Sequence, residues 1–199
     1  MVGIIDYGVG NLFSLRSSFA AIGVEAFVSG DAAELAKADR LILPGVGAFG
    51  DAAAKLRASG LDAFVREQAA AGKPLMGICL GMQLIFERSY EYGDHEGLGL
   101  LKGQVVGMSG RLPEGLKIPH MGCNALKVTK SAKLLEAGSD VYFVHSFYAE
   151  NCEDSIAAVT DYGIPITAAV EKGNVFGCQF HPEKSGNVGL EILRKFCEI

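Results

Sequence analysis

Residues 74–86 read PLMGICLGMQLIF, an apolar run in which a cysteine stands between two glycines. Residues 74–78 have the length and apolar character of a buried strand, and apolar residues at helical spacing resume at Met82. A strand that turns abruptly into a helix, with a nucleophilic side chain at the corner, has the form of a nucleophile elbow. We therefore expect Cys79 at the carboxyl end of a buried strand, where the following helix N-terminus favours its thiolate.

The same order of strand, loop and helix is repeated along the first half of the chain. Short apolar runs are followed by turn residues and then by apolar side chains at helical spacing, such as Leu12, Leu15 and Phe19. Strands that alternate with helices imply right-handed crossovers, so the pattern predicts an α/β fold with a doubly wound, mostly parallel sheet and flanking helices. The predicted strands of this half are residues 2–5, 24–28, 41–43 and 74–78, and its helices begin near residues 12, 31, 51, 61 and 82.

The second half of the chain is richer in strand patterns. Residues 172–174, with the sequence Lys-Gly-Asn, have the composition of a hairpin turn, and residues 188–197 are predicted to form a last helix. No linker, repeat or low-complexity segment is present, so we expect a single domain over residues 1–199. The predicted strands of this half are residues 99–108, 125–129, 141–147, 156–160, 166–171 and 175–180.

The composition is that of a soluble globular protein, because 49% of the 199 residues are hydrophobic and 21% are charged. Acidic and basic residues are interspersed at a net charge of −5, so we expect no nucleic-acid partner. The longest apolar run, residues 74–86, is shorter than the roughly 18 residues of a membrane span, so we expect no membrane association. The first residues lack a basic region ahead of a long apolar segment, which favours a cytoplasmic enzyme.

The five cysteines are widely spaced and include no C-x-x-C pair. This spacing argues against a disulfide framework and against a zinc site. We expect no metal and no cofactor, and we interpret Cys152, Cys178 and Cys197 as core or surface thiols without a function.

A histidine and a carboxylate follow the last predicted strand as Phe180-His181-Pro182-Glu183. Residues at i and i+2 of an extended chain face the same way, and Pro182 restrains His181 to extended geometry. The carboxylate can therefore orient the imidazole, and Cys79, His181 and Glu183 together make a nucleophile, a base and an orienting group. Taken singly, a buried structural cysteine and a structural histidine are the competing interpretations.

A glycine-rich loop, Pro44-Gly45-Val46-Gly47, follows the predicted strand at residues 41–43. Its backbone N–H groups at Val46 and Gly47, together with that of Leu80, are candidates to hold an oxyanion. The alternative is an ordinary turn between a strand and a helix. Because ligands of open α/β sheets bind beyond the carboxyl ends of the strands, we expect these three segments to converge.

In this order and over this length, the segments resemble the class I glutamine amidotransferases, whose nucleophile motif is G-x-C-x-G-x-Q and whose histidine and glutamate come late as H-P-E. Within that family the chain is similar to the glutaminase subunits of imidazole glycerol phosphate synthases. The segments that carry this closer similarity are residues 4–12, 43–47, 119–122, 143–146 and 179–185.

The resemblance implies an enzyme that hydrolyses glutamine through a cysteinyl thioester. It also implies a heterodimer in which ammonia passes to a (β/α)8-barrel cyclase subunit. That subunit makes imidazole glycerol phosphate and aminoimidazole carboxamide ribonucleotide in histidine biosynthesis. Glutaminase activity is then expected to be low until the partner binds its nucleotide, because the peptide between Val46 and Gly47 must turn its N–H toward the oxyanion.

The resemblance also assigns roles outside the triad. Glutamine binding falls to Gln83, Glu91, His145, Ser146 and Phe147, and the partner interface to Asn11, His120, Met121, Gly122, Cys123 and Lys184. Two positions depart from the family pattern, since Cys123 stands where tryptophan is usual and Phe147 where tyrosine is usual. From the residues alone, Gln83, Glu91 and Lys184 are equally well explained as a helix residue, a solvated carboxylate and a loop lysine.

Three other functions remain open from the sequence. The first is a stand-alone cysteine hydrolase or peptidase of similar fold. The second is a glutaminase subunit that serves another synthase, such as those of anthranilate, aminodeoxychorismate or pyridoxal phosphate. The third is a non-catalytic scaffold that retains a vestigial triad.

Overall fold

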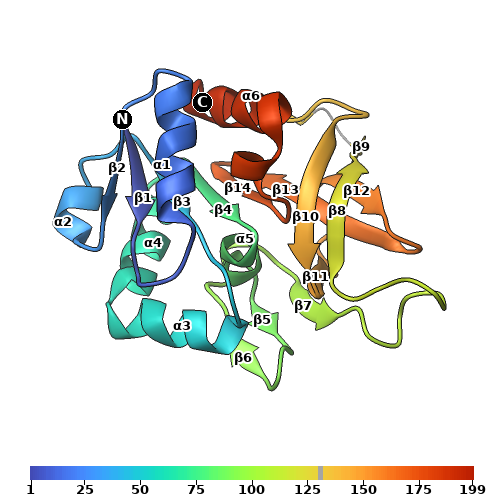
Figure 1. Ribbon diagram of the computed structural model, residues 1–199. Coiled ribbons are helices and arrows are strands. Elements are labelled where there is room, and N and C mark those ends of the chain that lie inside the picture. The colour runs from blue at the N-terminus through green and yellow to red at the C-terminus, as the bar shows by residue number, and fades with distance from the viewer. Residues whose placement is uncertain (130–131) are drawn as a thin grey trace.

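The computed structural model describes residues 1–129 and 132–199, and its centre is an eight-stranded sheet (Figure 1). Pairings from β2 through β14 are parallel, whereas those from β14 to β9 are antiparallel. This arrangement confirms the predicted α/β class and places the strand-rich half of the sequence at the antiparallel end. The strand order is β2 (Ala26–Ser29), β1 (Val2–Ile5), β3 (Arg40–Leu43), β4 (Leu75–Ile78), β14 (Val175–Cys178), β13 (Pro165–Lys172), β12 (Ile156–Asp161) and β9 (Lys127–Val128).

Helices cover both faces of the parallel half of the sheet, as the alternation of apolar side chains requires. Val2 and Ile4 pack in one cluster with Phe19 of α1 and Phe196 of α6, whereas Ile5 points into the cluster on the other face. Within the described residues, every helix is too short or too polar to span a lipid bilayer. The first face carries α1 (Leu12–Ala21) and α6 (Gly186–Cys197), and the second carries α2 (Ala32–Leu35), α3 (Phe49–Ala58), α4 (Leu61–Ala70) and α5 (Leu80–Ile85).

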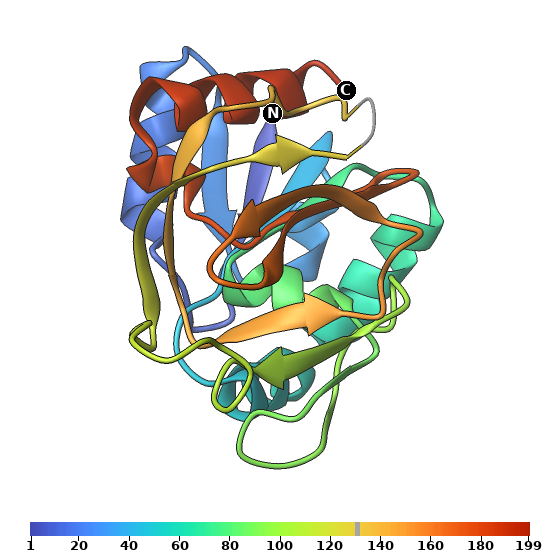
Figure 2. The same ribbon diagram turned by 90° about the vertical axis from the view of Figure 1, so that its right-hand side faces the viewer.

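Two smaller sheets, formed mostly by the second half of the chain, lie on the side of the molecule that faces the viewer in Figure 2. In one of them β8 (His120–Ala125) pairs with β10 (Asp140–His145) alone. The other has the order β11 (Phe147–Glu150), β7 (Gln104–Gly107), β5 (Arg88–Ser89) and β6 (His95–Glu96), and the short helix η1 (Pro182–Lys184) precedes α6.

The predictions were least accurate in these smaller sheets. The expected strand at residues 99–108 is confined to β7, and the one at residues 141–147 is divided at Ser146 between β10 and β11, which belong to different sheets. Strand β8 was not predicted, because a strand of a two-stranded sheet with one exposed side has no continuous apolar run.

The turn between β4 and α5 depends on two glycines. Cys79 has a positive φ of 54°, as a sharp elbow requires. A Cβ on Gly77 would lie 2.5 Å from the carbonyl oxygen of Gly81, and a Cβ on Gly81 would lie 1.8 Å from the carbonyl oxygen of Leu43. Both contacts involve backbone atoms that cannot move aside, so only glycine fits at either position.

We expect Gly81→Ala to lower the free energy of unfolding by about 3 kcal/mol or more, because the added methyl group overlaps the end of β3. Gly138→Ala is the matched control, since Gly138 has a φ of +81° but no atom within 4 Å of an added Cβ, and it should cost only about 1 kcal/mol. Urea denaturation measures both values. Equal effects of the two substitutions would contradict the steric argument.

Candidate active site

Three strand ends meet at a cavity of about 370 Å³. Strand β4 is paired in parallel with β3 on one side and with β14 on the other, so their carboxyl ends share one edge of the sheet. The sequence prediction that the three segments converge is therefore confirmed. The cavity is lined by Val46, Gly47, Cys79, Leu80, Gln83, Glu91, Tyr92, Pro119, Val144, His145, Ser146, Phe147, His181 and Lys184.

Cys79 stands at the corner between β4 and α5, with 8% of its surface exposed. Its backbone N–H donates to the carbonyl oxygen of Cys178 at 2.7 Å, which fixes the elbow to the neighbouring strand. The Cys79 sulfur also accepts a hydrogen bond from Nε2 of Gln179 at 3.7 Å. The nucleophile is thus held by both its backbone and its side chain.

His181 lies at the same edge, and its Nδ1 donates to Oε1 of Glu183 at 2.8 Å. Burial by itself lowers the pKa of His181, but hydrogen bonding to Cys79 and Glu183 and the negative charges of both outweigh it and raise that pKa to about 9. The protonated form of the imidazole is thereby favoured beside the Cys79 sulfur. A histidine in this position is suited to act with a nucleophilic thiol.

The glycine-rich loop after β3 offers unpaired backbone donors. Within the described residues, the N–H groups of Val46, Gly47 and Leu80 donate to no backbone acceptor. Gly47 has a φ of +89°, which glycine adopts without strain. These groups border the same cavity as Cys79, so an oxyanion formed there has hydrogen-bond donors available.

Tyr7 holds this loop through a buried hydrogen bond, and no role was predicted for it from the sequence. Its hydroxyl donates to the carbonyl oxygen of Pro44 at 2.7 Å, and a Cβ on Gly45 would lie 3.0 Å from the same hydroxyl. Burial, and secondarily the charge of Cys79, raises the pKa of Tyr7 well above its usual range, so the hydroxyl remains a donor. A buried tyrosine can be recognised as a positioning group only when its partner is known.

Gln83 and Glu91 both border the cavity, but a protein partner already occupies one of the two polar atoms of each side chain. Nε2 of Gln83 donates to the Phe147 carbonyl at 3.1 Å and to Oε1 of Gln179 at 3.0 Å. Oε2 of Glu91 accepts the N–H of Phe49 at 2.7 Å and so caps α3. Burial raises the pKa of Glu91 although this hydrogen bond opposes the shift. Only one oxygen of each side chain is left for a ligand.

His145 has no free ring nitrogen with which to act as an acid or a base. Its Nδ1 donates to the Phe147 carbonyl at 2.8 Å, and its Nε2 lies 3.0 Å from Nδ1 of His120. Burial, with smaller opposing and supporting contributions from its neighbours, lowers the pKa of His145 to about 3. The neutral ring therefore supports the backbone beside Ser146, which lines the cavity.

The residues expected at a partner interface divide into an exposed group and one buried residue. Met121 is 63% exposed, and Cys123 and Lys184 are exposed as well. His120 is fully buried, and its ring stacks on those of Phe143 and Tyr162. The His120 side chain is therefore turned away from the surface that carries Met121, because alternate residues of β8 point to opposite sides. Its assignment to a partner interface stays a prediction. Asn11 and Gly122 are half-buried.

Three other thiols, two buried and one half-buried, are held in their neutral form. Burial raises the pKa of Cys152 to about 11, and it raises the pKa values of Cys178 and Cys197 as well. These thiols are poor nucleophiles at neutral pH. No cluster of three or more potential metal ligands is found in the part of the chain that the structure describes.

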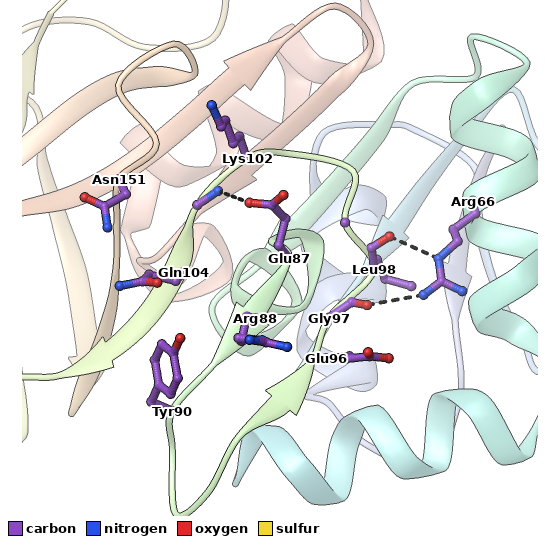
Figure 3. A pocket seen from close by; sticks show the side chains of 12 residues that line it. Arg66, Glu87, Arg88, Tyr90, Glu96, Gly97, Leu98, Lys102, Gln104 and Asn151 are labelled. Carbon is purple, nitrogen blue, oxygen red and sulfur yellow. Dashed lines mark hydrogen bonds between the residues drawn. The ribbon is translucent and has the colours of Figure 1, made fainter.

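A larger cavity, of about 600 Å³, lies elsewhere and is shown in Figure 3. The Arg66 guanidinium donates to the carbonyl oxygens of Gly97 and Leu98, and Glu87 accepts the N–H of Gly103. These side chains are paired with backbone, and the wall contains neither cysteine nor histidine. The smaller cavity is therefore the one with the groups needed for nucleophilic catalysis.

Comparisons with known proteins agree over nearly the whole chain. Residues 3–199 match the family described as Glutamine amidotransferase class-I. A Wolinella succinogenes protein named imidazole glycerol phosphate synthase subunit HisH is 50% identical over 204 residues, covering 100% of both chains. Proteins of the same name from Bacillus velezensis and Methanothermobacter thermautotrophicus are 50% and 49% identical, covering 100% of this chain and 96% and 98% of theirs.

Solved structures share the fold at much lower sequence identity. One, described as a glutamine amidotransferase, has a TM-score of 0.78 at 22% identity and covers 99% of this chain and 97% of its own. PurLQS from Thermotoga maritima has a TM-score of 0.74 at 22% identity and covers the same shares. At these identities the likeness concerns the fold alone.

We expect the His181 imidazole to titrate near pH 9 in a nuclear magnetic resonance titration. Glu183→Gln should move this midpoint downward, because the hydrogen-bonded negative charge is lost. Since its pKa is raised above the model-peptide value of 6.5, protonated His181 stabilises the fold fully below that pH, and this stabilisation is lost as pH rises through about 9. A midpoint near 6.5 in the wild-type chain would disprove the charged resting state.

Proposed function

The chain belongs to the class I glutamine amidotransferases, and on that premise we propose that it is the glutaminase subunit of an imidazole glycerol phosphate synthase. Residues 1–199 then form a single amidotransferase domain. The observation that carries the proposal is the arrangement of three side chains at the sheet edge. Cys79 and His181 line one cavity, and Nδ1 of His181 lies 2.8 Å from Oε1 of Glu183, which orients the ring. The relatives named imidazole glycerol phosphate synthase subunit HisH, which this chain covers over nearly their whole length, support the choice of synthase.

The proposed reaction starts from the Cys79 thiolate and the His181 imidazolium. The sulfur attacks the side-chain amide carbon of glutamine, and the carbonyl electron pair moves to oxygen. His181 gives its proton to the amide nitrogen, the carbon–nitrogen bond breaks, and ammonia leaves a cysteinyl thioester. The imidazole then takes a proton from water, the hydroxide attacks the thioester, and glutamate departs as the thiolate and imidazolium are restored.

The tetrahedral intermediate carries a negative charge that needs donors placed beforehand. The Leu80 N–H follows directly after Cys79 in the elbow, and the N–H groups of Val46 and Gly47 come from the facing loop. Each such donor contributes roughly 3 to 4 kcal/mol to transition-state stabilisation in comparable hydrolases. Glutamine itself contacts the remaining oxygens of Gln83 and Glu91 and the strand edge at residues 145–147 in this proposal.

Exposed apolar side chains beside the cavity support a partner subunit. Val46 is 44% exposed and Tyr92 is 87% exposed, and both line the cavity, while Met121 projects from β8 with 63% exposed. Apolar surface gathered around a catalytic cavity favours a protein contact that also closes the site to water. We propose a (β/α)8-barrel cyclase as this partner, with Lys184 and Cys123 at the same contact.

The test of the function is glutamate release from glutamine by the chain alone and mixed with a barrel cyclase subunit and its nucleotide. Strong stimulation by the partner is expected. Cys79→Ala should reduce the rate by at least about 10³-fold, and Glu183→Gln by roughly 10²-fold, because the latter loses imidazole orientation but retains the nucleophile. Glu191→Gln, at an exposed carboxylate of α6, is the matched control and should have no effect.

Each other outcome of this assay selects an alternative. Activity that ignores the cyclase but depends on Cys79 would point to another synthase. Cleavage of peptides or simple amides without any partner would indicate a stand-alone hydrolase, and no activity under any condition would indicate a scaffold.

The proposed interface predicts a change in thiol reactivity. Cys123 is exposed in the free chain, so it should react readily with a maleimide. Partner binding should slow that reaction about tenfold or more, because interface burial excludes the reagent. The half-buried Cys197, at the end of α6, is the control and should be unaffected, with both rates read by peptide mass spectrometry. Equal labelling of Cys123 in the free and bound chain would place the interface elsewhere.

A further inference from the structure

A backbone carbonyl sets the orientation of two buried amide side chains. The oxygen of Phe147 can only accept, so the group of Gln83 that lies 3.1 Å away must be its NH₂. The same NH₂ lies 3.0 Å from Gln179, which must therefore present its oxygen there. Because the oxygen of Gln179 faces Gln83, its NH₂ lies on the other side of the amide group, 3.7 Å from the Cys79 sulfur.

The position of Gln179 in the chain suits this contact. It follows β14 directly and stands two residues before His181, and the chain bends at residues 179 and 180. Gln179 is fully buried, and its backbone N–H is fixed to the carbonyl oxygen of Ala168 at 2.9 Å. A fully buried amide with both ends occupied has little freedom to rotate or to flip.

We propose that Gln179, oriented in series by the Phe147 carbonyl and Gln83, is a positioning residue that holds the Cys79 sulfur and stabilises it as a thiolate. The catalytic importance of this contact rests on the proposed function, but the contact itself is present in the chain without substrate or partner. A hydrogen bond to an ionised acceptor is about twice as strong as one to a neutral acceptor, so the amide favours the charged sulfur.

The same network restricts how Gln83 meets glutamine. Both of its amide protons are used by Phe147 and Gln179, so Oε1 is the only polar atom it can offer. Gln83 therefore acts toward a substrate as an acceptor, which suits an ammonium or amide N–H group. Its loss should disturb the sulfur as well as the substrate, because Gln179 would lose the donor that orients it.

The experiment measures the rate of Cys79 alkylation by iodoacetamide as a function of pH. Cys79 is the only cysteine between Arg66 and Arg88, so a tryptic peptide reports it separately from the other thiols. Gln179→Met removes the donor at similar size, and its reactivity midpoint should rise by roughly 0.5 to 1 pH unit. Gln179→Glu should raise it further, because it keeps the acceptor for Gln83 but turns a negative oxygen toward the sulfur.

The matched control is Gln104→Met, at another glutamine whose NH₂ donates a single side-chain hydrogen bond, to Glu150 at 3.0 Å. Its alkylation profile should equal that of the wild-type chain. If Gln179→Met does not fold, Gln83→Met decides the question, because Gln179 then loses the donor that orients it while no charge is added near the sulfur. Unchanged midpoints in the folded Gln179→Met or Gln83→Met chain would overturn the proposal.

The alkylation assay needs neither glutamine nor a partner, so it separates this inference from the proposed function. A wild-type chain that fails to hydrolyse glutamine but shows the expected shifts retains Gln179 in its role. If the chain hydrolyses glutamine but the Gln179 variants show no shift, the proposed function stands and the role of Gln179 is disproved.

Discussion

The close approach of α5 to the end of β3 is the constraint on which the site depends. The missing side chain of Gly81 lets the backbone of α5 lie against the Leu43 carbonyl, where a Cβ would be only 1.8 Å away. Gly45, two residues further along, lies against the same helix, since its Cβ would lie 2.7 Å from the Gly81 nitrogen. Because of these contacts, the loop that offers free N–H groups and the elbow that carries the nucleophile border one cavity.

Once these backbones are in place, fixed acceptors organise the polar side chains. The Phe147 carbonyl accepts hydrogen bonds from both Gln83 and His145. Gln83 also donates to Gln179, and the Gln179 amide donates to the Cys79 sulfur. Buried polar groups are costly unless they are paired, so a network that ends on a backbone oxygen has one low-energy arrangement.

Local sequence patterns were enough to predict the parallel half of the fold and the meeting of Cys79 and His181 at one cavity. The glycines around Cys79 and the proline after His181 constrain the chain within a few residues, so their geometry can be read from neighbours in sequence. Tyr7 and Gln179 could not be assigned in this way, because their partners lie 37 and 100 residues away. The burial of the His120 side chain could not be predicted either, because the side of β8 that it faces depends on pairing with β10, which no local pattern reveals.

The distribution of hydrogen bonds also indicates where control over such a site can act. Cys79, Gln179, Gln83 and His181 are each held by protein partners, and changing any of them means breaking a buried contact. Val46 differs, because it is 44% exposed, stands between two glycines and has an N–H without a backbone acceptor in the described residues. Reorienting its peptide breaks no such contact, and glycine tolerates the new dihedral angles. In the proposed function, a partner that packs on this exposed loop therefore completes the oxyanion site while the nucleophile stays in place, which separates regulation from chemistry.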